Sequence, residues 1–529
     1  MRRREFLKGG AALTAAALAT PAVIAAERQR VLKFVPQTDV AGLDPVWTPT
    51  YPARDHALMV FDTLFAQDDS YQAVPQMVDG VVTENDGLTW RLMLRPGLVF
   101  HDGSPVLARD CVASIQRWAK RDSFGGALMA ATNELSAADD KTIVFRLKRP
   151  FPLLPDALGK SYPRICPMMP ERLAKTDAFT QITEMVGSGP FRFVANERVA
   201  GARLVYERFD GYVPRPSGTT QWTSGPKIVH FDRVEWTIIP DPSTAFSALK
   251  SGEIDWWWTP DADLLAALRD DKNVNVRIAD PTGQIGTLRF NHLIAPFDNP
   301  ALRRAVLGAI DQRDFMTAIV GDDTTLWRDG VGYFCPGTPY ASSAGLEVLT
   351  GPRDIEKSKA AVKAAGYKGE KVVVLAPADI PNLKALADMT ADMLTKIGFI
   401  VDYQAMGWGA LVQRRFKEDP VEQGGWNIFS TFWSGMDQST PAGHAFIRGN
   451  GKPTGPGWPT APKIEALRDA WLEASDEASR KTIAANMQVQ ALEDVPYAPL
   501  GQYFFATAHR ADLTGILNGL PAFWNVRRG

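Results

Sequence analysis

Residues 231–260, FDRVEWTIIPDPSTAFSALKSGEIDWWWTP, contain three structural signals in a row. FDRVEWTIIP has the β-branched and aromatic residues of a strand, STAFSALKSG those of a short helix ended by Gly252, and IDWWWT those of a second strand. A strand, a helix and a strand in this order can form a right-handed crossover, which places two parallel strands in one sheet. The stretch therefore predicts an α/β fold.

The second strand of this unit carries three consecutive tryptophans. Neighbouring side chains on a strand point to opposite faces, so Trp256 and Trp258 share one face and Trp257 takes the other. We expect Trp257 to pack into the core and the other two to face a cleft or its rim, with Trp258 contacting a solute. The periodicity alone also allows the opposite assignment of the two faces.

The chain beyond residues 288–292 repeats the α/β alternation. Asn299 and Asp354 are candidate helix caps, and Gly366 is a helix stop. KVVVLAP and FIVDYQAM have the pattern of strands, with a helix between them. Because 529 residues are too many for one hydrophobic core, we expect this half to form a lobe of its own.

Composition excludes several classes of protein. The formal net charge is -2 and no basic run with aromatics occurs, which argues against a nucleic-acid partner. Beyond the first residues no run of 18 apolar residues occurs, so we expect a soluble mature protein. Cys111, Cys166 and Cys335 lie far apart without metal-ligand spacing, and we expect buried free thiols.

The N-terminus, MRRREFLKGGAALTAAALATPAVIAAERQ, has a basic head and a short Ala-rich apolar stretch. RREFLK resembles the twin-arginine export motif, and residues 1–26 are predicted to be a cleaved signal peptide. A chance basic start before an ordinary signal peptide is the alternative. Either route exports the chain to the periplasm, and without a cysteine near the cleavage region we expect no lipid anchor.

The most specific stretch is GLTWRLMLRPGLVFHDGSPVLARD, residues 87–110, which predicts two strands around the turn formed by residues 95–97. Further blocks follow in a fixed order: LDP (43–45), GSGPFRFV (187–194), ALKSGEID (248–255), RFNHLIAPFDNPALRRAVLGAID (289–311), AGYKG (365–369) and LEDVPYAPL (492–500). Each block alone has a structural explanation as turn or helix-end chemistry. Together they resemble the extracellular solute-binding proteins of family 5, the peptide and nickel receptors of ABC importers.

The resemblance implies a two-lobe periplasmic-binding-protein fold, type II and cluster C-like, with an extra N-terminal subdomain. We expect lobe I at 27–285, with the extra subdomain at about 60–185, lobe II at 286–500, and a return to lobe I at 501–529. The lobes would close on a solute across a hinge that the chain crosses twice. Expected partners are a small or short-peptide ligand and the ABC permease, and the expected receptor is a monomer.

Candidate ligand contacts come from two segments that the resemblance singles out. The segment after LDP offers Trp47, Thr48, Thr50 and Tyr51, and the segment after WNIFSTFW offers Asp437 as the partner of a solute ammonium group. Gly-Met-Asp-Gln-Ser-Thr-Pro departs from the family pattern there, so an exposed turn aspartate is the alternative. Aromatic wall candidates are Trp408, Trp426 and Trp433, each also a candidate core residue.

Four functions remain open at this level. The leading one is a receptor for a short peptide or peptide-like solute, and a nickel-chelate receptor is a variant in which His444 and His56 are candidates. A twin-arginine-exported enzyme and a chaperone-like peptide-holding protein are the others. Because no nucleophile elbow, zinc signature, P-loop or dinucleotide fingerprint occurs, we expect neither enzyme activity nor a cofactor.

Overall fold

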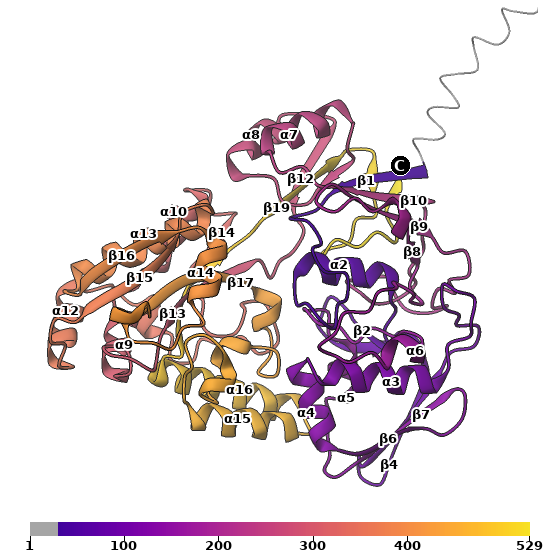
Figure 1. Ribbon diagram of the computed structural model, residues 1–529, viewed down its shortest axis with the longest axis horizontal. Coiled ribbons are helices and arrows are strands. Elements are labelled where there is room, and N and C mark those ends of the chain that lie inside the picture. Colours follow the sequence, from indigo (N-terminus) through magenta and orange to yellow (C-terminus); the bar gives the residue numbers. More distant parts are fainter. Residues whose placement is uncertain (1–29) are drawn as a thin grey trace, which may run out of the picture.

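Two large β-sheets, one in each of two lobes, organise this computed structural model (Figure 1). The structure describes residues 30–529, so the predicted signal peptide lies outside the described residues. Within that range no helix combines the length and hydropathy that would span a bilayer.

The sheet of lobe I has seven strands in the order β12-β19-β11-β1-β10-β9-β8. Its strands are β1 (Val31–Val35), β8 (Phe191–Phe193), β9 (Arg203–Arg208), β10 (Arg233–Thr237), β11 (Trp256–Trp257), β12 (Val274–Ile278) and β19 (Ala506–Arg510). Both β10 and β11 pair parallel to β1. Helix α7 (Pro242–Ser251) connects them, starting at the Asp241 cap and ending at Gly252 with φ of 75°. The predicted crossover is confirmed.

The crossover explains the three tryptophans. Trp256 packs with Phe34 of β1, at 5.1 Å between ring centroids, in a core closed by Phe523. Trp257 packs on the other face against α7 and α8 (Leu265–Arg269). The expectation that Trp256 faces the cleft is therefore wrong, because both faces of this sheet are covered, as in most sheets with parallel strands. Trp258, beyond the strand end, is half-buried.

The segment 65–174, which we call the extra subdomain, adds a four-stranded antiparallel sheet to lobe I in the order β4-β5-β7-β6. Its elements are the hairpin β2 (Phe65–Gln67) and β3 (Ala73–Pro75), β4 (Val78–Glu84), β5 (Thr89–Leu94), α3 (Ala108–Ala119), α4 (Ser123–Ala131), β6 (Thr132–Ala137), β7 (Thr142–Leu147), α5 (Leu154–Gly159) and α6 (Glu171–Ala174). Only the first of the two strands predicted around residues 95–97 forms. Since β4 and β7 already occupy both edges of β5, Val99 makes a single bridge to Pro105 instead.

The sheet of lobe II has six strands in the order β14-β18-β13-β17-β15-β16. Its strands are β13 (Gln284–Phe290), β14 (Trp327–Arg328), β15 (Lys371–Pro377), β16 (Ile400–Met406), β17 (Ile428–Ser434) and β18 (Tyr497–Tyr503). The helices are α9 (Pro300–Leu307), α10 (Gln312–Val320), α11 (Glu347–Thr350), α12 (Ile355–Ala364), α13 (Pro381–Lys396), α14 (Trp408–Arg414), α15 (Pro462–Glu473) and α16 (Glu477–Asp494). Asn299 and Asp354 cap α9 and α12 through their side chains, as predicted.

Two linking segments join the lobes. Residues 279–283 connect β12 to β13, and residues 504–505 connect β18 to β19. The expected lobe limits, after residues 285 and 500, fall inside β13 and β18, both of which belong to the lobe II sheet. Far from these links, α15 and α16 face α4 and α5 of the extra subdomain (Figure 1), where Phe124 and Trp471 contact each other at 6.4 Å between ring centroids.

Candidate functional site

The lobes meet near the linking segments through a tyrosine and an aspartate. Tyr51 opens helix α2 (Tyr51–Val60) of lobe I, and Asp437 lies in the 3-10 turn η4 (Gly435–Gln438) that follows β17 of lobe II. The Tyr51 hydroxyl donates to Asp437 Oδ2 at 2.8 Å and accepts the Ser434 N–H at 2.9 Å. The turn is held in place because the Ser434 hydroxyl accepts the Met436 N–H at 3.2 Å. One hydroxyl thus connects both lobes.

Asp437 is a buried carboxyl group with one free oxygen. It is 5% exposed, and Oδ1 has no hydrogen-bond partner among the described residues. Burial raises the pKa of Asp437 to about 6, against the hydrogen bond from Tyr51 and the charges of Arg54 and Lys160. The alternative that Asp437 is an exposed turn residue is therefore wrong. A buried oxygen without a hydrogen-bond partner lowers the stability of the fold, so a bound group that donates a hydrogen bond to it is favoured.

More carboxyl groups than positively charged side chains surround the hydrogen bond between Tyr51 and Asp437. Arg54, one helical turn after Tyr51, donates from Nε to Asp55 Oδ1 at 2.8 Å and lies 5.3 Å from the centroid of the Tyr51 ring. Asp280, in the first linking segment, accepts from the Thr282 N–H at 2.8 Å, and burial raises its pKa. Because Arg54 is already paired with Asp55, the remaining carboxyl groups favour a positively charged group here.

Two cavities lie along the interface of the lobes. The first, which we call the hinge cavity, is lined by residues of both lobes and of the first linking segment, including Tyr51, Arg54, Trp258, Asp280, Gln284 and Ser434. Trp258, half-buried and edge-on to Trp256 at 5.8 Å, therefore borders the same space as Tyr51.

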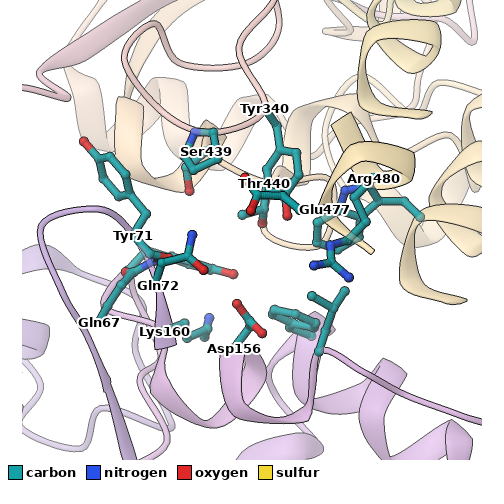
Figure 2. Close-up of a pocket in the computed structure, with 15 residues that line it drawn as sticks. Gln67, Tyr71, Gln72, Asp156, Lys160, Tyr340, Ser439, Thr440, Glu477 and Arg480 are labelled. Atoms are coloured by element: carbon teal, nitrogen blue, oxygen red, sulfur yellow. Dashed lines mark hydrogen bonds between the residues drawn. The ribbon is translucent and has the colours of Figure 1, made fainter. Parts of the chain in front are cut away.

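The second, which we call the outer cavity, lies between the extra subdomain and lobe II and has a volume of about 80 Å³ (Figure 2). Gln67, Gln72, Asp156 and Lys160 line it from the extra subdomain, and Tyr340, Thr440 and Arg480 from lobe II. One water needs roughly 10–15 Å³ by the same measure, so the cavity has room for a small polar group.

Asp437 lies between the two cavities without lining either, and the remaining predicted residues do not line them. Thr50 is the exposed N-cap residue of α2. Trp408 begins α14 with its ring half-buried, and Trp433, near the end of β17, packs on Phe446 at 5.1 Å between ring centroids. Trp426 is fully buried beside Trp458, and its indole N–H donates to the Arg415 carbonyl at 3.0 Å. The structure thus corrects the cleft-wall prediction for Trp426, which lies in the core of lobe II.

The two histidines considered for a metal chelate also lie in cores. His56 Nδ1 is 2.9 Å from the Tyr206 hydroxyl, and His444 Nε2 is 3.0 Å from the Tyr497 hydroxyl. Burial lowers the pKa of His56 to about 3 and that of His444 well below its usual value. Among residues 30–529 no three His, Cys, Asp or Glu side chains gather in a metal-binding group. The three cysteines are free and buried, as expected.

Sequence reasoning missed most of the charged residues of the interface. Arg54 follows Tyr51 at helical spacing, so the first turn of α2 could have indicated it. Asp156 and Arg480 had no such signal, because each reads as an ordinary charge on a helix surface. Only the tertiary structure, which places α5 opposite α15 and α16 (Figure 1), brings them to one cavity.

Comparison with known proteins agrees with this geometry. The sequence profile described as "Bacterial extracellular solute-binding proteins, family 5 Middle" matches residues 72–454, more than half of the chain. The chain belongs to family 5 of the bacterial extracellular solute-binding proteins. This family 5 protein thus has the two-lobe fold that the sequence blocks predicted.

Individual relatives extend the similarity over nearly the whole chain. A probable peptide ABC transporter periplasmic-binding protein of Sinorhizobium fredii is 36% identical, over 99% of both chains. The ABC transporter-associated periplasmic binding protein DppA of Helicobacter pylori, solved with the peptide STSA, superposes with a TM-score of 0.76 at 21% identity, covering 96% of this chain and 99% of that one. AgaA of Agrobacterium tumefaciens R10, solved with agropinic acid, gives a TM-score of 0.77 at 21% identity, covering 94% and 99%. This protein is a solute-binding receptor.

Proposed function

We propose that this family 5 protein is the periplasmic receptor of an ABC importer and captures a short peptide or peptide-like solute between its lobes. The observation that carries the proposal is the buried Asp437 carboxyl where the two lobes meet, whose Oδ1 has no hydrogen-bond partner in the part of the chain that the structure describes. The name of the 36% identical relative, a probable peptide-binding receptor, supports a peptide over other solutes.

Capture needs reversible closure and no chemistry. A solute that contacts both lobes binds the closed form better than the open form, so it shifts the population towards closure. The linking segments at 279–283 and 504–505 are the proposed hinge. A solute ammonium group would donate to Asp437 in a charge-assisted hydrogen bond. Tyr51 holds the other oxygen of that carboxyl, which orients the acceptor.

The setting of this receptor is part of the same proposal. Residues 1–26 would be removed after twin-arginine export, the mature protein would work as a monomer without a lipid anchor, and it would have no enzymatic activity. A nickel-chelate receptor is the second candidate within the family, and it stays open because a chelated metal needs few protein ligands.

Native mass spectrometry of the mature protein, isolated from periplasm without dialysis, tests the proposal first. We expect a discrete added mass, lost on denaturation, that fragments as a short peptide. A nickel isotope pattern would favour the chelate receptor, and a redox cofactor or a turned-over product would overturn the receptor function.

Substitution of Asp437 tests the site itself. In Asp437→Asn we expect the affinity for the identified peptide to fall about 30-fold or more, as when one partner of a buried charge pair is removed. Asp322→Asn, an exposed aspartate of lobe II, makes the same charge change away from the interface and serves as the control. Equal affinities in both variants by calorimetry would remove Asp437 from the site.

A further inference from the structure

The outer cavity brings one carboxyl and one guanidinium group face to face from different lobes. Asp156 lies in α5 of the extra subdomain and Arg480 in the first turn of α16 of lobe II. Figure 2 shows both side chains directed into the cavity. The positive charge of Arg480 acts to lower the pKa of Asp156, so the two groups interact electrostatically. Within residues 30–529, however, no ion pair joins them. The cavity lies between the two charges.

The other charged groups of this cavity already have partners. The Lys160 ammonium donates to Asp122 and to the Pro163 carbonyl, and Glu477 pairs with Lys481 at 2.7 Å. Arg480 uses Nη1 for the Ala474 carbonyl at 2.9 Å and also lies within hydrogen-bonding reach of the Tyr340 hydroxyl, while its buried Nε has no partner among the described residues. Asp156 and Arg480 are therefore the two charged groups of this cavity that have no ion-pair partner among the described residues.

The aromatic side chains of the cavity wall strengthen the electrostatic interactions of Asp156 and Arg480. Phe124, Trp471 and Tyr340 line the space beside these half-buried charges, so electrostatic interactions are stronger there than at an open surface. Burial raises the pKa of Asp156 to about 6, and the positive charge of Arg480 opposes that shift. The Tyr162 hydroxyl is a further buried group without a partner in the described residues.

Charge complementarity limits the kinds of chemical group that can bind in the outer cavity. A group with only a positive charge would be repelled by Arg480, and a group with only a negative charge would be repelled by Asp156. A zwitterionic group, with both charges a few ångströms apart, satisfies both residues. Because these residues belong to different lobes, such a group would also hold the lobes together.

We propose that the outer cavity binds an α-amino-acid head group, with ammonium and carboxylate on one carbon, its ammonium on Asp156 and its carboxylate on Arg480. The inference rests on the proposed function, since it assumes that the solute lies between the lobes. It adds a chemical class: solutes that keep a free α-amino-acid end, as in side-chain-linked dipeptides. Ordinary dipeptides carry their ammonium and carboxylate on different residues.

Isomeric dipeptides provide the test. γ-L-glutamylglycine and Nε-glycyl-L-lysine keep an α-amino-acid head group, whereas α-L-glutamylglycine and Nα-glycyl-L-lysine have the same atoms and net charges without one. The affinity of the mature protein for each is measured by calorimetry. We expect the head-group isomer of each pair to bind about 10- to 100-fold more tightly, the effect typical of charged hydrogen bonds.

Three variants connect that preference to the cavity. Asp156→Asn and Arg480→Gln are expected to abolish the isomer preference, while Glu477→Gln keeps it, because Glu477 lines the same cavity but is paired with Lys481. Circular dichroism and the unfolding temperature establish that each variant is folded.

Two outcomes overturn this inference without touching the proposed function, and a third counts against both. Equal binding of the isomers, or a preference that survives both Asp156→Asn and Arg480→Gln, overturns the head-group inference alone. Binding of ordinary α-linked peptides, lost in Asp437→Asn, with no binding of the head-group isomers, also overturns it while supporting the receptor function. Failure to bind any peptide counts against both.

Discussion

The two ends of the interlobe cleft are built in opposite ways. At the hinge end the lobes touch directly, since Tyr51 bonds Asp437 and the Gly435 N–H donates to the Gly283 carbonyl at 2.9 Å. At the outer end the lobes also touch, through Phe124 and Trp471, but Asp156 and Arg480 face each other without an ion pair in the described residues (Figure 2). The difference is that a direct hydrogen bond joins side chains of the two lobes at the hinge end, whereas the outer end keeps two opposite charges apart.

The largest effect is expected from a methyl group at the hinge end. A Cβ on Gly435 would lie 2.0 Å from the Thr282 carbonyl oxygen and 2.5 Å from Cys335 Sγ. The nearest clash is with backbone, which cannot move to another rotamer as a side chain can. We therefore expect Gly435→Ala to destabilise the fold by about 3 kcal/mol, measured by denaturant unfolding.

Gly443 at the outer end is the matched comparison. Its Cβ would meet only the Tyr162 ring, at 2.8 Å, and a side chain can shift more easily than backbone. Gly443→Ala should therefore cost clearly less, and Gly409→Ala, with open space around the new methyl, should cost nothing. If Gly443→Ala is as damaging as Gly435→Ala, the outer end is as rigid as the hinge end.

Removing the hydroxyl that connects the lobes comes next. Tyr51→Phe leaves Asp437 without a protein hydrogen bond to either oxygen, and we expect a loss of about 2 kcal/mol in the free energy of unfolding. Tyr503→Phe is the control, because its buried hydroxyl has no partner among residues 30–529 and its removal should be neutral or stabilising. A neutral Tyr51→Phe would mean that the hinge contact does not hold the lobes.

Solute affinity should depend on pH with a defined sign. Burial raises the pKa of Asp437 and of Asp156 to about 6 in the solute-free protein, and an ammonium group bound at either carboxyl needs that carboxyl to be ionised. Binding therefore releases protons below pH 6, and the affinity falls by up to about tenfold per pH unit for each carboxyl as pH drops, while it is constant above pH 7.

Calorimetry between pH 5 and 8 checks this prediction and separates the two ends of the cleft. Asp437→Asn and Asp156→Asn should each remove one carboxyl from the pH dependence. An affinity that stays constant from pH 5 to 7 would contradict an ionised carboxyl at either end.

The smallest effect is expected from the exposed ion pair at the outer end. Arg149 follows β7 in the extra subdomain and pairs with Glu473 at the end of α15, with side chains 41% and 53% exposed. Such surface pairs contribute about 0–1 kcal/mol and are screened by salt. Arg149→Gln should leave the unfolding free energy and the solute affinity nearly unchanged, and a large loss in low salt would show that this pair holds the outer end closed.

Most of the fold could be predicted from local sequence signals. The crossover around β10, α7 and β11 follows from periodicity and from a glycine that ends the helix, and the caps Asn299 and Asp354 mark helix starts that the structure confirms. These signals act over a few residues, so they survive in the sequence alone. The strand expected after residues 95–97 failed because its place beside β5 was already taken, which is a tertiary constraint.

Sites made by distant residues were harder to predict. Tyr51 and Trp258 line the hinge cavity and Asp437 bonds Tyr51, while their contact with a solute stays a prediction. Trp256 and Trp426 belong to cores because layers from elsewhere in the chain cover them. By itself the sequence determined an α/β chain of two lobes and its family, because periodicity, capping and ordered motifs are local properties. Only the tertiary structure decided which aromatic faces are covered and that Asp156 meets Arg480 across the cleft, because burial and charge pairing depend on neighbours far away in the chain.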